Sequence, residues 1–187
     1  MGQTIGGYLK TYGLNLDFAP VADVNTNPAN TVIGNRAFSS DPAVAAQMVA
    51  SAVQGFHDAG ILCTLKHFPG HGDTAEDSHY GTASSTKTWA EMRETELKPF
   101  AAGIAAGADV VMTAHITTPN ATQDGLPCWV SVKQFSKNDT ATACQDWLRS
   151  TRLGRGSIKS HVRTVKVLGM GLFAFQERIH LWKGVTH

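Results

Sequence analysis

The chain has 187 residues, of which 42% are hydrophobic and 17% are charged, and its formal net charge at pH 7 is +1. This length and composition suit one domain with a sizeable core and argue against an intrinsically disordered chain. The near-neutral charge argues against a dedicated nucleic-acid-binding protein, because such proteins normally carry a clear basic excess.

Helices and strands are predicted to alternate through the first 116 residues. Two helix starts are marked by Asp41-Pro42, an N-cap followed by proline, and by the capping-box spacing of Thr88 and Glu91. In chain order we expect a helix over 3–12, a strand within 14–24, a polar loop over 25–40, a helix over 41–60, a strand over 60–65, a helix ending at 107 and a strand over 108–116.

Apolar spacing predicts which face of each longer helix is buried. The second helix repeats an apolar residue every four positions, and the third has a similar set before Gly107. The two sets are Val44, Met48, Ala52 and Phe56, and Leu97, Phe100 and Ile104. Strands that alternate with helices indicate an α/β fold with a parallel sheet and right-handed crossovers.

Polar residues follow the predicted strands at Asp23, Lys66, His67 and His115. In parallel α/β folds the active site lies at the carboxyl ends of the strands. The stretch 66–79, KHFPGHGDTAEDSH, is therefore a candidate active-site loop.

Three chemical interpretations of this loop remain open beside the simpler one, in which its residues only form turns and caps. Metal binding by its histidines and His115 is disfavoured, because Pro69 and two glycines prevent the helix that would align His67 with His71. Lys66 could form a Schiff base.

In the third interpretation, Asp77 accepts the Nδ1 proton of His79, so that the imidazole can protonate a leaving group. Arg36, Lys66 and His67 then donate hydrogen bonds to an oxygen-rich substrate.

Three motifs make the chain resemble the family 3 glycoside hydrolases, and in particular their bacterial β-N-acetylglucosaminidase branch, from about Gly2 to Pro127. They are NLDFAPVADV at 15–24, IGNRAF at 33–38, and KHFPGHGDT at 66–74 followed by Asp77-Ser78-His79. The resemblance implies a (β/α)₈ barrel and a retaining glycosidase that needs no cofactor or metal.

The same resemblance implies that His79 is the general acid/base with Asp77 as its partner. Arg36, Lys66 and His67 match residues that hold the hydroxyl groups of the sugar. Asp23 receives no role, and His71 is expected to shape the loop.

The resemblance fails where the family places its nucleophile, an aspartate on a later strand. Leu153-Gly154 begins a similar pattern, but no acidic residue lies between Asp146 and Glu177. A (β/α)₈ barrel also needs about 250 residues. We therefore expect an incomplete barrel of three strands, with apolar edges left exposed.

Charge divides the chain into two parts. Residues 1–127 contain 6 Lys and Arg against 12 Asp and Glu, whereas residues 128–187 contain 10 against 3. We interpret 1–127 as the partial barrel domain and 128–187 as a divergent basic tail, either genuine or read in a shifted frame. The three cysteines are too dispersed to indicate a disulfide framework or a zinc knuckle.

The function expected from this sequence is hydrolysis of terminal β-linked N-acetylglucosamine from peptidoglycan fragments or related glycans. The alternatives are an inactive sugar-binding remnant and a metal-dependent hydrolase. Expected partners are N-acetylglucosamine-containing glycans or muropeptides, with neither nucleic acid nor a membrane span. The start of the chain lacks the pattern of a signal peptide, which favours the cytoplasm.

Overall fold

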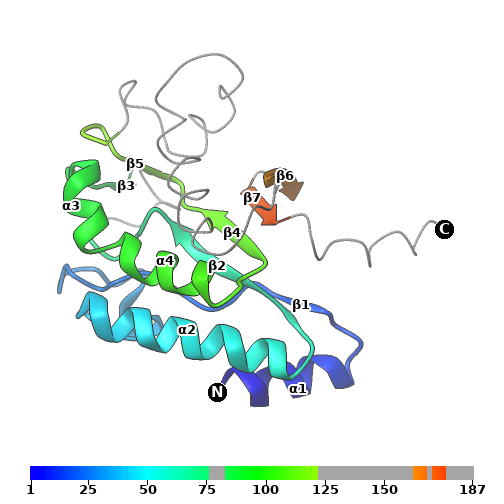
Figure 1. The fold of residues 1–187 in the computed structure, drawn as a ribbon. Coiled ribbons are helices and arrows are strands. Elements are labelled where there is room, and N and C mark those ends of the chain that lie inside the picture. The colour runs from blue at the N-terminus through cyan, green and yellow to red at the C-terminus, as the bar shows by residue number, and fades with distance from the viewer. Residues whose placement is uncertain (76–82, 122–161, 168–169, 176–187) are drawn as a thin grey trace.

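The computed structural model describes residues 1–75 and 83–121, and the backbone of 162–167 and 170–175 (Figure 1). In these ranges the helices are α1 (Gly2–Thr11), η1 (Gly34–Arg36, a 3₁₀ turn), α2 (Pro42–Asp58), α3 (Trp89–Glu94) and α4 (Leu97–Ala105). The strands are β1 (Leu16–Asp17), β2 (Leu62–Phe68), β3 (Ala83–Ser84), β4 (Val110–Thr113), β5 (Ile116–Thr117), β6 (Val162–Val167) and β7 (Met170–Phe175).

The first three strands of the main sheet are parallel and lie in the order β1-β2-β4. Helices α2 and α4 pack beside each other against β2, and α1 packs against α2 (Figure 1). A second small sheet pairs β3 with β5, also in parallel. The prediction of an α/β fold with parallel strands alternating with helices is therefore confirmed.

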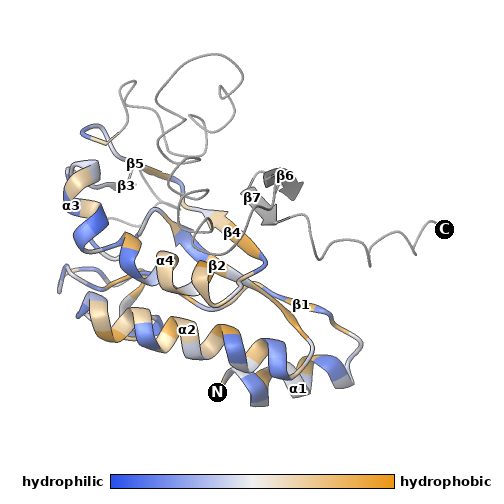
Figure 2. Ribbon diagram, viewed as in Figure 1, coloured by the Kyte–Doolittle hydropathy of each residue, from blue (hydrophilic) through white to orange (hydrophobic). Residues whose placement is uncertain are grey.

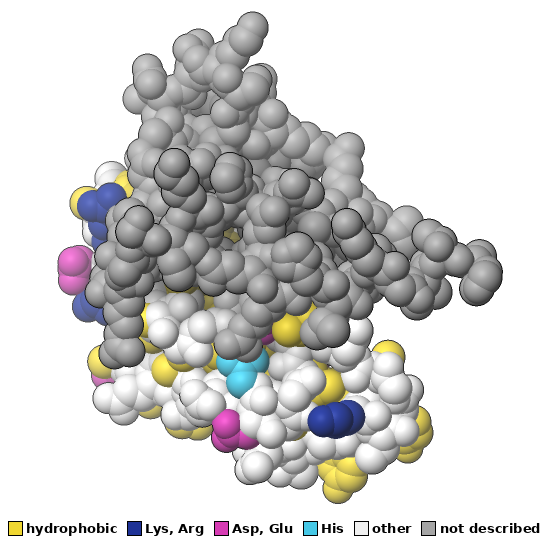
Figure 3. All heavy atoms as spheres, turned by 45° about the vertical axis from the view of Figure 1, so that its right-hand side comes forward, with side chains coloured by type: hydrophobic (Ala, Val, Ile, Leu, Met, Phe, Trp, Pro, Cys, Tyr) yellow, Lys and Arg dark blue, Asp and Glu magenta, His cyan; other side chains and the backbone are white. Residues whose placement is uncertain are grey.

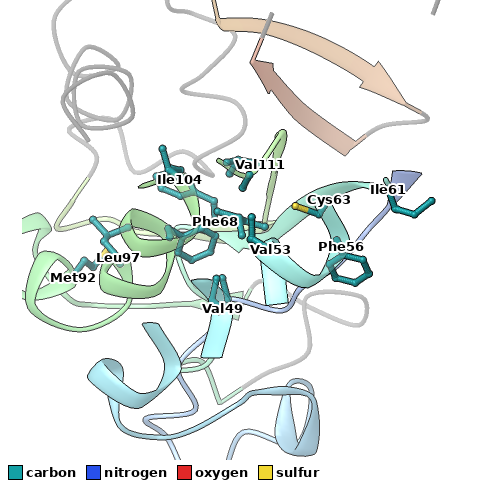
Figure 4. Close-up of a cluster of buried hydrophobic side chains, with 14 residues drawn as sticks. Val49, Val53, Phe56, Ile61, Cys63, Phe68, Met92, Leu97, Ile104 and Val111 are labelled. Carbon is teal, nitrogen blue, oxygen red and sulfur yellow. The ribbon is translucent and has the colours of Figure 1, made fainter. Parts of the chain in front are cut away.

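The core lies between β2 and β4 and the two longer helices (Figure 4). Val53 and Phe56 come from α2, Phe100 comes from α4, and Leu65 and Val111 come from the strands, and all five are at most 1% exposed. Colouring by hydropathy shows that α4 is largely apolar, whereas the C-terminal end of α2 is polar (Figure 2). The sheet is therefore covered by apolar helix faces.

The buried face of α2 differs from the prediction. Val44 and Met48 are each 46% exposed, while Ala45 and Val49 are buried. An α-helix turns about 100° per residue, so a stripe repeated every four residues drifts by about 40° per step. Ala52 and Phe56 thus lie on the buried face, and the first two members of the stripe have rotated out of it.

The helix start and stop signals agree with the structure. Asp41 accepts hydrogen bonds from the N–H groups of Ala43 and Val44 at the start of α2. Thr88 and Glu91 form the reciprocal capping box of α3. Gly107 adopts a positive φ of 97° after α4, as a helix stop favoured by glycine requires.

The expected strand within 14–24 is shorter than predicted. Only Leu16–Asp17 form β1, and beyond Pro20 the backbone pairs with β2 in one isolated β-bridge, between Val21 and Lys66. Pro20 has no N–H to donate to a ladder, which favours interruption of the strand. The backbone still follows β2, because the carbonyl oxygen of Ala19 accepts from Thr64 N at 2.8 Å.

The far edge of β4 is paired, contrary to the expectation of an exposed edge. β7 lies antiparallel to β4, with Val111 opposite Phe173, and β6 lies antiparallel to β7. These two strands fall where no pattern was recognised, although Val162–Val167 is rich in β-branched residues, which favour strands. The spacing of Phe135, Ala143 and Leu148 predicts a weak helix over 133–148, which lies outside the described residues.

Two further observations concern membrane crossing and surface charge in the described part of the chain. No described helix has the length and apolar character that a membrane crossing requires. On the face shown in Figure 3, the described basic and acidic side chains are interspersed rather than gathered into a patch of one sign.

Candidate functional site

The carboxyl end of β2 contains a β-bulge. Lys66 pairs with Met112 and Phe68 pairs with Thr113, so that His67 is the extra residue between them. Bulges turn side chains out of the regular alternation and are frequent beside active sites. The strand thus runs through Lys66 and His67, which the sequence had placed in a loop directly after it.

Asp23 holds this strand end in place. Its buried carboxylate contacts His67 Nδ1 at 2.7 Å and accepts from the backbone N–H groups of His67 at 3.2 Å and His71 at 2.7 Å. A carboxylate only accepts, so Nδ1 of His67 carries a proton. Nε2 of His67 is therefore the nitrogen that Asp23 leaves available to a ligand.

Lys66 is a half-buried cation at the same strand end. Burial, and next the positive charge of Arg36, lower the pKa of Lys66 below its ordinary value, while Asp17 and Asp23 act in the opposite direction. No hydrogen bond or ion pair joins the Lys66 ammonium to another residue in the described part of the chain. Within the described residues, neither Lys66 nor Arg36 forms an ion pair with a carboxylate, and such a pair of cations favours a ligand rich in oxygen.

Arg36 lies at the end of η1 and is exposed. Its guanidinium donates to the carbonyl oxygen of Val32 at 2.6 Å, which leaves further donors available. The structure thus brings the charge of Arg36 within electrostatic reach of Lys66, although the two residues are 30 positions apart.

Asn30 fastens the loop after β1 to the loop after β2. Its side-chain amide is buried and donates to the carbonyl oxygens of His71 at 2.7 Å and Thr74 at 2.8 Å, and its oxygen accepts from Ile33 N at 2.8 Å. His71 Nδ1 in turn lies 2.7 Å from Thr74 Oγ1. His71 therefore shapes the loop, in agreement with the prediction.

Asp73 joins the two chain segments that flank residues 76–82. Asp73 itself precedes these residues, and its carboxylate accepts from Ser85 Oγ, which follows them, at 2.9 Å. The same carboxylate accepts from Thr26 Oγ1, in the loop after β1, at 3.1 Å. Lys87 Nζ lies 3.1 Å from the same carboxylate. The predicted acid/base residues Asp77 and His79 lie between Asp73 and Ser85 in the sequence, outside the described residues.

The charges of Asp73, Lys87 and Glu96 stabilise one another. Burial alone would raise the pKa of Asp73, but hydrogen bonds from Ser85, Lys87 and Thr26 hold it below its ordinary value. Burial likewise opposes the charge of Lys87, yet contacts with Glu96 at 2.5 Å and with Asp73 raise the pKa of Lys87. Glu96 is fully buried and also accepts from the Thr95 hydroxyl.

The polar residues that the sequence placed at strand ends do lie at or directly after those ends. Asp23 contacts His67 beside Lys66, and His115 follows the carboxyl end of β4, where it is exposed. Among the described residues, His67, His71 and His115 do not form a three-ligand metal group.

Sequence reasoning missed the roles of four residues, which are Asp23, Asn30, Asp73 and Lys87. Asp23 and Asp73 stand inside the recognised motifs, so their position was a usable signal. Asn30 and Lys87 offered none, because each acts through contacts between segments at least nine residues apart.

Comparison with known proteins places this geometry in a family. The family described as the glycosyl hydrolase family 3 N terminal domain matches residues 1–138. A beta-hexosaminidase of Stenotrophomonas maltophilia (strain K279a) is 51% identical over 111 residues, covering 59% of this chain and 32% of the relative. One from Xylella fastidiosa (strain M23) is 49% identical over 112 residues, covering 60% and 33%.

Solved structures agree with the sequence comparison. A glycoside hydrolase family 3 beta-N-acetylglucosaminidase from Paenibacillus sp. str. FPU-7 superposes with a TM-score of 0.66 at 43% identity, covering 68% of this chain and 24% of that one. NagZ from Neisseria gonorrhoeae, in complex with N-trifluoroacetyl-D-glucosamine, gives 0.64 at 31% identity, covering 74% and 40%.

The chain spans about a third of the length of the curated relatives. Its match to the family over residues 1–138 includes all the strand-end residues described above. The chain belongs to glycosyl hydrolase family 3, through the N-terminal domain of that family.

Proposed function

We propose that the whole protein to which these residues belong removes terminal β-linked N-acetylglucosamine from glycans or muropeptides, as part of peptidoglycan turnover. The observation that carries this proposal is the end of β2, where Asp23 fixes His67 beside the cationic Lys66. Such donors suit the hydroxyl and acetamido oxygens of a sugar. The names of the similar proteins support the choice of sugar.

In the proposed reaction, His79 donates a proton to the leaving glycosidic oxygen, and Asp77 holds the imidazole in the required tautomer. A carboxylate nucleophile attacks the anomeric carbon and forms a glycosyl-enzyme. Water, deprotonated by His79, then releases the sugar with retained configuration. The contacts of Asp73 with Ser85 and Lys87 support this assignment, because they tie together the two segments that flank residues 76–82.

For the 187-residue chain itself we propose sugar binding with little or no turnover. The family's nucleophile pattern has no aspartate counterpart after Leu153-Gly154. The antiparallel pairing of β7 on β4 also departs from the all-parallel strands of a (β/α)₈ barrel. Both observations support residues 1–127 as the partial barrel domain and 128–187 as a divergent tail.

One assay tests the chain as given. An aryl β-N-acetylglucosaminide is incubated with the chain, with and without a chelator, and release of the phenol is followed. We expect release near the uncatalysed rate, because loss of a nucleophile usually costs several orders of magnitude. Turnover unaffected by the chelator would contradict the binding-only proposal, and turnover abolished by it would favour metal-dependent hydrolysis.

A second experiment tests the acid/base assignment in a full-length protein of the same family. The histidine that aligns with His79 is replaced by alanine, and the rates with poor and activated leaving groups are compared. A poor leaving group needs protonation, so its rate should fall far more. Equal losses for both substrates would refute the acid role, and matched folding of variant and wild type by circular dichroism is the control.

A further inference from the structure

A second cluster of chemically active side chains lies at the opposite end of β2. His57 comes from the last turn of α2, Cys63 from the start of β2, and Asp109 from the residue before β4. Cys63 is four residues from His67, or about 13 Å along a strand. The proposed sugar site therefore uses none of these three residues.

The three ligand atoms converge on one point. His57 Nε2 lies 2.8 Å from Asp109 Oδ2 and 4.0 Å from Cys63 Sγ, and all three groups lie within 4.8 Å of one another. Metal–ligand bonds of about 2.0 to 2.3 Å in a tetrahedron place ligand atoms about 3.3 to 3.6 Å apart. The observed separations bracket these values, so small side-chain movements would bring the three ligand atoms into tetrahedral positions around one metal ion.

Asp109 gives a second and independent indication of a ligand. Asp109 is only 6% exposed. Its Oδ2 accepts a hydrogen bond from the backbone N–H of Cys63 at 3.0 Å and also contacts His57 Nε2. Oδ1 is buried as well, and no group in the described part of the chain donates to it. A buried carboxylate oxygen without a donor is unfavourable, and a bound cation would satisfy it.

The chemistry of the three groups selects the cation. One imidazole nitrogen, one thiolate and one carboxylate form a mixed set that suits zinc, whereas magnesium and calcium prefer oxygen ligands alone. Three protein ligands leave a fourth position for water, and the His57 side chain, 13% exposed, gives access to solvent. The side chain of Cys63 extends from β2 into the hydrophobic core (Figure 4).

We propose that His57, Cys63 and Asp109 form a binding site for zinc or a similar divalent transition metal. A bound ion would join the end of α2 to the starts of β2 and β4. The competing explanation is a purely structural hydrogen-bonded cluster, in which His57 and Asp109 make the same connection without a metal.

Zinc binding to the full 187-residue chain tests this proposal. The chain is freed of metal by a chelator and titrated with Zn²⁺ in competition with a chromophoric chelator. We expect a site that is at least tenfold weaker in Cys63→Ser and in His57→Gln but unchanged in Cys144→Ser, the matched thiol control. Equal affinity in all four proteins, or no binding, would overturn the proposal.

Cobalt supplies a readout that does not depend on the stability of a ligand variant. In a chain carrying Cys128→Ser and Cys144→Ser, Cys63 is the only cysteine left, and Co²⁺ should still produce a thiolate-to-cobalt charge-transfer band. Absence of this band in a chain that is folded by circular dichroism refutes ligation by Cys63. Zinc should also raise the urea midpoint of this chain, and an unchanged midpoint counts against a folded-state site.

Discussion

Replacement of Gly72 by alanine tests how tightly the loop after β2 is packed on the loop after β1. A Cβ at Gly72 would lie 1.9 Å from the carbonyl oxygen of Val24, 2.5 Å from its carbonyl carbon and 3.0 Å from Asn25 N. These are backbone atoms, so relief requires one loop to move. The loops are joined by Asn27 N to Gly72 O at 3.2 Å and by the Asn30 amide.

The expected cost combines two effects. Overpacking of a buried position costs about 1 to 3 kcal/mol, and the loss of one hydrogen bond between the loops adds about 1 kcal/mol. We therefore expect Gly72→Ala to lower the free energy of unfolding by about 2 to 4 kcal/mol. The measurement is urea denaturation followed by circular dichroism, with the slope of the transition checked for constancy.

Gly7→Ala is the matched control, because it adds the same methyl group where a Cβ would meet nothing within 4 Å. Gly7 is exposed within α1, and alanine there should stabilise the chain by about 0.5 to 1 kcal/mol. If the free energy of unfolding of Gly72→Ala lies within about 0.5 kcal/mol of the wild-type value, which is typical of a surface substitution, the close packing of the two loops is contradicted.

Three further changes test other parts of the structure. Val49→Ala should cost about 2 kcal/mol and Val44→Ala less than about 0.5, since only Val49 is buried, and equal urea midpoints would contradict this. The pKa of Asp73 is lower in the folded chain than its ordinary value of 3.8, so its carboxylate stabilises the fold above that value and this stabilisation is lost as the pH falls. Asp73→Asn should therefore lose less stability than the wild type between about pH 5 and pH 3, measured by urea denaturation, and equal losses would contradict this. Asp23→Asn leaves one oxygen acceptor for three donors and should destabilise the chain by about 2 to 4 kcal/mol, whereas an unchanged midpoint would refute the anchoring role.

Local signals in the sequence predicted much of the helical structure. Caps at Asp41, Thr88 and Glu91 act within a few residues, so that the sequence contains both partners of each interaction. The buried face of α2 was predicted only in part. Residues spaced four apart move steadily around a helix of about 3.6 residues per turn, so they cannot all stay on one face of a long helix. The strand β7 was missed because its pairing with β4 joins residues about 60 positions apart.

The candidate site shows the same division between local and distant interactions. The motif 66–79 identified Lys66 and His67, but no sequence pattern reveals a bulge that makes His67 the extra residue of β2. The anchoring role of Asp23 depends on a contact across 44 positions. The mixed cluster of His57, Cys63 and Asp109 lacks ligand spacing in the sequence, because its members come from three separate elements.

The most direct test of the central claim, that the end of β2 binds a sugar, is calorimetric titration of the 187-residue chain with N-acetylglucosamine. Lys66→Met removes the charge and keeps the length of the side chain, and Lys98→Met, at an exposed ion pair on α4, is the control. A charge-assisted hydrogen bond contributes about 1.5 to 3 kcal/mol. We predict saturable binding that weakens about 10- to 100-fold in Lys66→Met and stays unchanged in Lys98→Met; no binding, or equal affinity in all three proteins, would contradict the claim.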